Sequence, residues 1–230
     1  MIELRGKALA LIVGVWCLSA AADVRRPTAP EASQVDDAVP ALTSGAPPAP
    51  TPATREAKIV ARAREEVARR VAYDAAYFRL SFLAETDTGH AVYPGGDLDP
   101  QRGVCTDVVI RALRAAGVDL QERVHADILA RRAAYPRIPA PDANIDHRRV
   151  GPLLTYFRAH ATAVEGDDWQ AGDVVVWAFR ACPACTPDHI GIVSDRPGPR
   201  GLPLALHNIG PKPSEDDVLD AWTVLGHFRL

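Results

Sequence analysis

The spacing of apolar positions divides the chain into a helical first part and a strand-rich second part. Apolar side chains recur every three or four positions in several segments before residue 161, a period typical of amphipathic helices. Gly117 follows one of these segments, as a helix stop signal does. Helices are expected at residues 56–78, 105–116, 121–134 and 153–160, and loops at residues 86–100 and 136–152.

Beyond residue 172 the pattern changes to short runs rich in β-branched residues, separated by Pro, Gly and Asp. Such runs predict strands of a mostly antiparallel sheet. Helices followed by strands favour an α+β fold, with the helices packed on one side of the sheet. Strands are expected at residues 173–179, 189–194, 204–208 and 222–229.

The first 54 residues differ from the rest. Basic residues at Arg5 and Lys7 precede an apolar run at 8–18 and small residues at 19–22, which is the layout of a secretory signal peptide. An uncleaved anchor helix is the alternative, although the run is short for one. Residues 23–54 contain seven prolines among Ala, Ser and Thr. We expect a signal peptide at 1–22, a disordered linker at 23–54, one domain at 55–230, and a periplasmic or secreted bacterial protein.

Composition narrows the class of protein. A charged fraction of 24% with 47% hydrophobic residues is ordinary for a globular protein and excludes a fully disordered chain. A net charge of −3 provides no basic footprint for nucleic acid, so no nucleic-acid partner is expected. Without an apolar run of about 18 residues, no membrane span is expected after signal cleavage.

Cys105 is the first candidate for chemistry, because it opens a predicted helix. Backbone N–H groups at a helix start stabilise a thiolate, and they can also stabilise the oxyanion of an acyl transfer. A buried structural cysteine is the alternative.

His189 begins a predicted strand and could serve as the general base that a cysteine nucleophile requires. Gly191, two residues later, allows another group to approach that strand closely. His207 ends the next strand, where an antiparallel neighbour can orient His189. Asn208 is the competing orienting residue, but side chains alternate between faces, so one of the two points inward.

Cys182 and Cys185 form a CxxC motif, which can be a redox pair, half of a zinc site or a local disulfide. Zinc would require two further ligands. Because export is expected, we favour a disulfide, and we expect no metal and no cofactor.

The segments GVCTDVVIRALR, QAGDVVVW, HIGIVSD and LALHN resemble the core of NlpC-type cell-wall peptidases of the papain-like superfamily. The motifs YPGGD, GVCTDVVIR, NIDHRRV, HIGIVSD and HNIG resemble more closely a bacterial family, domain of unknown function 1287. The resemblance covers about residues 70–230. It implies a papain-like α+β fold and hydrolysis of an amide bond in peptidoglycan stem peptides. It further implies that Cys105 is the nucleophile, His189 the base and His207 the orienting residue.

Two departures accompany this resemblance. The usual Asp-Cys-Ser-Gly around the nucleophile is replaced by Val104-Cys105-Thr106-Asp107, and the stretch from Cys105 to Gly172 is longer than in typical members. That stretch contains two adjacent arginines with an Asp and a His, which could bind a substrate carboxylate or could lock the loop by internal pairing. Candidate substrate-binding residues are Tyr93, Asp97, Asp107, Asp146, His147, Arg148, Arg149 and Asn208, with a simple turn as the alternative for Tyr93 and Asp97.

The sequence therefore predicts a secreted cysteine peptidase or amidase that acts on peptidoglycan or another peptide-type substrate. The alternatives are a non-catalytic module that binds the cell wall, and a thiol-redox or zinc protein that uses the CxxC motif.

Overall fold

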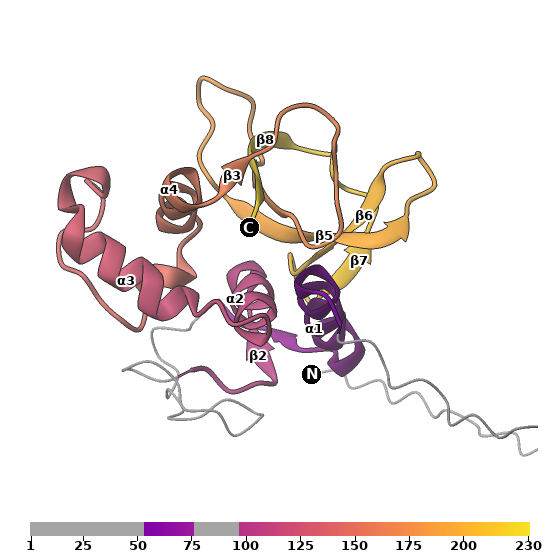
Figure 1. The fold of residues 1–230 in the computed structure, drawn as a ribbon, viewed down its shortest axis with the longest axis horizontal. Helices are drawn as coiled ribbons and strands as arrows, with labels where there is room; N and C mark the ends of the chain where they lie inside the picture. Colours follow the sequence, from indigo (N-terminus) through magenta and orange to yellow (C-terminus); the bar gives the residue numbers. More distant parts are fainter. Residues whose placement is uncertain (1–52, 76–96) are drawn as a thin grey trace, which may run out of the picture. The chain divides into compact units, whose positions relative to one another are not determined.

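The computed structural model describes residues 53–75 and 97–230 (Figure 1). The expected signal peptide, nearly all of the expected linker and Tyr93 lie outside the described residues. The elements are α1 (Arg55–Arg69), β1 (Ala72–Tyr73), β2 (Arg102–Gly103), α2 (Cys105–Ala115), α3 (Leu120–Ala130), η2 (Arg132–Ala134), η3 (Asp146–Arg148), α4 (Val150–His160), β3 (Thr162–Ala163), β4 (Val174–Ala178), β5 (His189–Pro197), β6 (Pro203–His207), β7 (Ser214–Asp216) and β8 (Thr223–Arg229).

The described part is a mixed α+β unit in which α1, α2 and α4 pack against an antiparallel sheet and α3 packs on α2 and α4 (Figure 1). The sheet has six strands in the order β3-β8-β4-β5-β6-β7, and β1 and β2 form a separate parallel pair. The four longest strands coincide with those expected from the sequence. The short strands β3 and β7 were not expected, because two or three residues are too few to show an alternating pattern.

Each face of the sheet carries its own apolar cluster, because successive side chains of a strand point to opposite faces. On the helix-covered face, Val176, Ile190 and Leu206 join the main core. On the opposite face, Val175, Val193 and Ala205 pack with residues of the connections, and this cluster also holds Trp177, Leu219 and Trp222. The second face is thus covered by connecting segments and carries the large aromatic residues.

The first helix is shorter than expected. It ends at Arg69 because Arg70 adopts a left-handed conformation, with φ of 56°, and its N–H closes on the carbonyls of Glu66 and Val67. The apolar spacing continued past this point because Val71, beyond the helix end, is also buried. The prediction of a helix over residues 56–78 was therefore wrong for residues 70–75, where the chain turns into β1, and its last three positions lie outside the described residues.

No helix within the described ranges is long and apolar enough to cross a bilayer.

Candidate functional site

The turn that precedes Cys105 is built by Asp107 and Gly103. Oδ2 of Asp107 accepts a hydrogen bond from the N–H of Val104, at 2.8 Å, and so caps the start of α2. A Cβ at Gly103 would lie 2.8 Å from Cβ of Asp107, so no larger residue fits. Cys105 is consequently fixed as the first residue of the helix. Asp107 is buried, and the structure gives it this capping role rather than an open position for a substrate.

Two opposing effects act on the Cys105 thiol. Burial raises its pKa to about 12, and the nearby carboxylate of Asp107 adds to this rise. Backbone N–H groups of Ile190, Thr106 and Cys105 itself act in the opposite direction. We expected the helix start to favour a thiolate. The N–H groups are present, but burial outweighs them and keeps the thiol protonated at neutral pH.

His189 and His207 form a hydrogen-bonded pair. Nε2 of His189 lies 2.8 Å from Nδ1 of His207, and the two rings meet edge to face with centroids 5.0 Å apart. Gly191 is opposite His207 in the β5–β6 register, and a Cβ there would lie 3.1 Å from both Cβ of His207 and the Trp177 ring. The missing side chain at position 191 makes room for the pair.

Both histidines are buried and neutral at physiological pH. Burial, reinforced by His207, lowers the pKa of His189 to about 3. Burial also lowers the pKa of His207, although Asp216 on β7 opposes that change. A neutral imidazole is the form that can accept a proton, so His189 is in the protonation state that a general base needs.

The link from the thiol to this pair runs through β5. The N–H of Ile190, the residue after His189, is one of the groups that act on the Cys105 sulfur. Within the described residues, no hydrogen bond joins Cys105 to the His189 ring. The structure thus places Cys105 beside the start of β5, and the two side chains belong to opposite sides of the sheet.

Asn208 takes a different role from His207. Its Nδ2 donates to the carbonyl of Gly103, at 3.3 Å, and its Oδ1 accepts from the N–H of Gly210, at 3.1 Å. Of the two candidates for orienting His189, His207 makes the contact, and Asn208 ties the end of β6 to the turn before Cys105.

Aromatic residues that the sequence analysis did not single out surround His189. The rings of Trp177 and Phe179 stack on it with centroids 5.6 and 5.5 Å away, and Trp222 meets it edge-on at 5.5 Å. Phe179 is 46% exposed and so presents an aromatic surface next to the candidate base. The alternation of side-chain faces along β4 could have indicated these aromatic neighbours, because Trp177 is directly paired with His189.

Tyr73 is a second residue that the sequence analysis missed. Tyr73 is 43% exposed, and its partial burial raises the pKa of the hydroxyl, with a contribution from the nearby Cys105. The ring also lies against Gly210, where a Cβ would come within 3.3 Å of it. Tyr73 therefore flanks the thiol. The expectation of a continuous helix over this segment concealed it.

Asp97 and Arg148 are buried partners. Nη2 of Arg148 donates to Oδ1 of Asp97, at 2.7 Å, and its Nε lies 3.2 Å from Oδ1 of Asp107. Arg114 binds the other oxygen of Asp97. Burial alone would raise the pKa of Asp97, but Arg114, Arg111 and Arg148 lower it to about 2. This network favours the internal lock over a substrate-binding role for Asp97 and Arg148.

The remaining residues of the NIDHRRV motif are mostly enclosed. His147 is buried with Nε2 2.5 Å from Nη1 of Arg148, and burial holds its pKa well below the ordinary range. Asp146 is buried and accepts from the N–H of Asp142, at 2.6 Å. Arg149 pairs with Asp146 at 3.3 Å, but 44% of its side chain is exposed. Of these three, Arg149 is the one placed to meet a ligand.

Cys182 and Cys185 are joined by a disulfide in the connection between β4 and β5, with their Cα atoms 4.5 Å apart. Their thiols are therefore not available as zinc ligands. The described part of the chain contains no group of three or more His, Cys, Asp or Glu side chains arranged to hold a metal ion.

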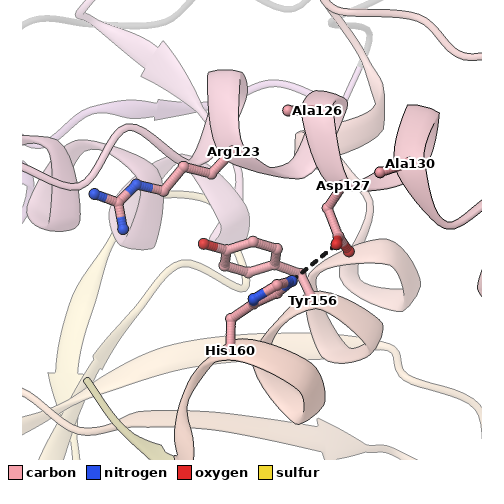
Figure 2. A pocket seen from close by; sticks show the side chains of 6 residues that line it. All are labelled: Arg123, Ala126, Asp127, Ala130, Tyr156 and His160. Atoms are coloured by element: carbon pink, nitrogen blue, oxygen red, sulfur yellow. Dashed lines mark hydrogen bonds and ion pairs between the residues drawn. The ribbon is translucent and has the colours of Figure 1, made fainter.

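A separate hollow lies between α3 and α4 (Figure 2). Asp127 lines it and binds three side chains: Oδ1 is 2.8 Å from Nε2 of His160 and 2.7 Å from Nε of Arg131, and the Tyr135 hydroxyl also binds this carboxylate. The contact with His160 joins α3 to α4. None of the candidate catalytic residues lines the hollow, whose lining residues are Arg123, Ala126, Asp127, Ala130, Tyr156 and His160.

Comparison with known proteins identifies the family. Residues 60–230 match the family model described as "Domain of unknown function (DUF1287)". The chain is also 44% identical, over 174 residues, to the "Uncharacterized protein YijF" of Escherichia coli (strain K12), an alignment that covers 73% of this chain and 78% of that protein. The family expected from the sequence motifs is thus confirmed, and the chain belongs to the DUF1287 family.

Proposed function

We propose that this protein is a cysteine peptidase or amidase that hydrolyses an amide bond, with peptidoglycan stem peptides as the expected substrate. The observation that carries the proposal is the 2.8 Å contact between His189 and His207 beside a thiol at the start of α2. A nucleophile, a base and a group that orients the base are the parts that this chemistry requires.

The direction of proton transfer depends on which of the two histidines donates the hydrogen bond between their rings. If Nε2–H of His189 donates to Nδ1 of His207, then Nδ1 of His189 carries a free lone pair. His189 is the first residue of β5, so its ring has to turn past the end of that strand for this nitrogen to reach Cys105. The nitrogen then takes the proton of Cys105 as Sγ forms a bond to the carbonyl carbon. His207 then stabilises the charge that develops on His189, as the third member of a catalytic triad does.

The remaining steps use the same groups. Backbone N–H groups at the start of α2 stabilise the oxyanion of the tetrahedral intermediate. The carbon–nitrogen bond breaks, and the amine leaves with the proton held by His189. Water, deprotonated by His189, attacks the thioester and releases the carboxylic acid, and the proton returns to Sγ of Cys105.

The architecture supports the same proposal. A helix that begins with a cysteine packs on an antiparallel sheet whose strands carry the histidines, which is the arrangement expected for a papain-like fold. The exposed aromatic surface at Phe179 and the exposed guanidinium of Arg149 offer contacts for a sugar or apolar group and for a carboxylate. Stem peptides carry several carboxylates.

One observation favours a second candidate, a cell-wall binding module without catalysis. The Cys105 thiol has a pKa raised to about 12, and it makes no hydrogen bond to His189 in the described structure. A module that uses the aromatic surface for recognition would not need a reactive thiol. Export to the periplasm or the medium is part of both proposals.

The deciding experiment is to incubate the protein, without its first 22 residues, with purified peptidoglycan and to analyse the soluble products by mass spectrometry. Cys105→Ala is the matched inactive variant. Arg200→Ala, on the surface, controls for effects of substitution and purification that do not involve the site. New fragments from the wild type and the control, but not from Cys105→Ala, would support the hydrolase, and their masses would identify the bond. Sedimentation with peptidoglycan but no fragments would support the binding module.

A further inference from the structure

The second ring nitrogen of His207 faces a carboxylate. Oδ2 of Asp216, on β7, lies 3.3 Å from Nε2 of His207. That nitrogen is enclosed and makes no hydrogen bond of good geometry within the described residues. An enclosed polar atom without a partner is costly, so an acceptor at this distance favours a hydrogen bond between the two groups.

The register of the sheet places this carboxylate on the correct face. Asp216 is paired with Ala205, and Glu215 is paired with Leu206. Because faces alternate along β6, Ala205 and His207 share the face that is not covered by helices. Asp216 therefore projects on the same face as His207, as its diagonal neighbour.

Glu215 anchors β7 from the other side. Its Oε1 accepts hydrogen bonds from Nη2 of Arg64, at 2.7 Å, and from Oγ of Ser194, at 2.5 Å. These contacts tie β7 to α1 and β5 through the helix-covered face. The three-residue strand thus separates its two carboxylates: Glu215 secures the strand, and Asp216 is left beside the histidine pair.

The tautomer of His207 follows from both of its neighbours. To accept from Nε2–H of His189, Nδ1 of His207 must be unprotonated, so the ring hydrogen of neutral His207 is on Nε2. A carboxylate next to Nε2 stabilises this tautomer, because it accepts a hydrogen bond and offers none. The charged and titratable groups that contact His207 are His189 from β5 and Asp216 from β7.

We propose that Asp216 is a positioning residue of the Cys105 site, which acts through His207 by holding the tautomer that accepts a hydrogen bond from His189. Its catalytic meaning rests on the proposed hydrolase function. The effect of Asp216 on the His207 tautomer does not rest on that function, because the tautomer is a property of the protein without substrate.

The first test therefore uses the protein without substrate. In the ¹⁵N-labelled protein, long-range ¹H–¹⁵N spectra of the imidazole rings report which nitrogen of each neutral histidine carries the hydrogen. We expect wild-type His207 to be protonated on Nε2, and Asp216→Ala to give a mixture of tautomers or the opposite one. Asp216→Glu should restore the wild-type pattern. Asp217→Asn is the matched control, because Asp217 is the next residue but pairs with Arg200, at 2.9 Å, and makes no contact with His207 within the described residues.

The second test is turnover of peptidoglycan as a function of pH. Asp216→Ala should lower kcat about 10- to 100-fold with little change in KM, since a hydrogen bond to a charged group contributes a modest free energy. Its pH profile should also shift, whereas Asp217→Asn should match the wild type. Should Asp216→Ala not fold, Asp216→Asn, which keeps the shape and removes the charge, takes its place in both tests.

Two results separate this proposal from the function on which it rests. A His207 tautomer that is unchanged in both Asp216→Ala and Asp216→Asn overturns the proposal, whatever the turnover. A changed tautomer in a protein whose wild type releases no fragments supports the contact between Asp216 and His207 and counts against the hydrolase.

Discussion

Nδ2 of Asn208 donates a hydrogen bond to the carbonyl oxygen of Gly103, 105 positions earlier in the chain, at 3.3 Å. The bond connects the residue that follows β6 to the turn that precedes Cys105. Asn208→Asp keeps the size but replaces the donor by an acceptor that faces the carbonyl in a buried position, so we expect turnover to fall several-fold and the free energy of unfolding to fall by about 1–3 kcal/mol. Urea unfolding and the peptidoglycan assay measure the two effects. Wild-type values in both would show that this bond does not couple the two segments.

Gly103→Ala tests how tightly the turn before the nucleophile is packed. The added Cβ would meet Cβ of Asp107 at 2.8 Å, so α2 must shift or Asp107 must leave its capping position. We expect a loss of about 1–3 kcal/mol in the free energy of unfolding. Gly151→Ala is the control, because its nearest contact is an ordinary 3.7 Å and the position lies in α4. Equal stability of the two variants would contradict the close packing at position 103.

Arg148 and Arg149 are adjacent but differ in burial, which makes them a matched pair. Arg148→Met leaves the buried carboxylates of Asp97 and Asp107 without their shared guanidinium, and we expect a loss of about 3–5 kcal/mol of stability. Arg149→Met should cost less stability, because that side chain is 44% exposed and its partner Asp146 keeps a hydrogen bond from the N–H of Asp142. If Arg149 binds a substrate carboxylate, its variant should raise KM with kcat unchanged. A stable Arg148→Met would argue against the internal lock.

The raised pKa of Cys105 predicts slow alkylation by iodoacetamide. Because the thiolate is the reacting form and burial raises this pKa to about 12, the rate should be low at pH 7 and rise with pH up to the point where the protein unfolds. Cys105 is the one free thiol of the described residues, so labelling of the protein without residues 1–22 reports on it directly. A rapid rate that is independent of pH between 6 and 8 would instead indicate a thiolate–imidazolium pair.

The lowered pKa of the Asp127 carboxyl predicts that the protein loses stability in acid. The hydrogen bond from Arg131, with further ones from Tyr135 and His160, holds the pKa of this carboxyl below its ordinary value, despite burial. A carboxyl with a lowered folded-state pKa stabilises the fold above its unfolded-state pKa of about 4, and this contribution is lost as the pH falls further. Asp127→Asn should therefore destabilise the protein at pH 7, and the difference from wild type should shrink below pH 4. A difference that stays constant with pH would refute this linkage.

The local pattern of apolar and turn-forming residues was sufficient to predict the elements that carry the candidate site. The start of α2 at Cys105 and the start of β5 at His189 follow from apolar spacing and turn residues alone, and β6 ends one residue before the expected end of its strand, at His207. That two sequential strands would pair, and so bring the histidines together, follows from antiparallel topology. The choice between His207 and Asn208 needed the register, which the sequence does not specify.

Other parts of the site depend on contacts that local pattern does not encode. Tyr73 was hidden because Val71 continued the apolar spacing of α1 after the helix had ended. Asp216 lies on a strand of three residues, which has no detectable period. The state of the Cys105 thiol depends on its partial burial by tertiary contacts, which a motif at a helix start does not report.

The position of the thiol and of the histidines on different layers has a consequence for how this protein would lose activity. Cys105 moves with the helices, whereas His189 and His207 move with the sheet and its outer aromatic cluster. The distance between nucleophile and base is thus set by how firmly one layer rests on the other, rather than by any single element. Mild heating or denaturant that lets the layers slide should inactivate the protein while each layer keeps its secondary structure, so inactivation would precede the loss of circular dichroism.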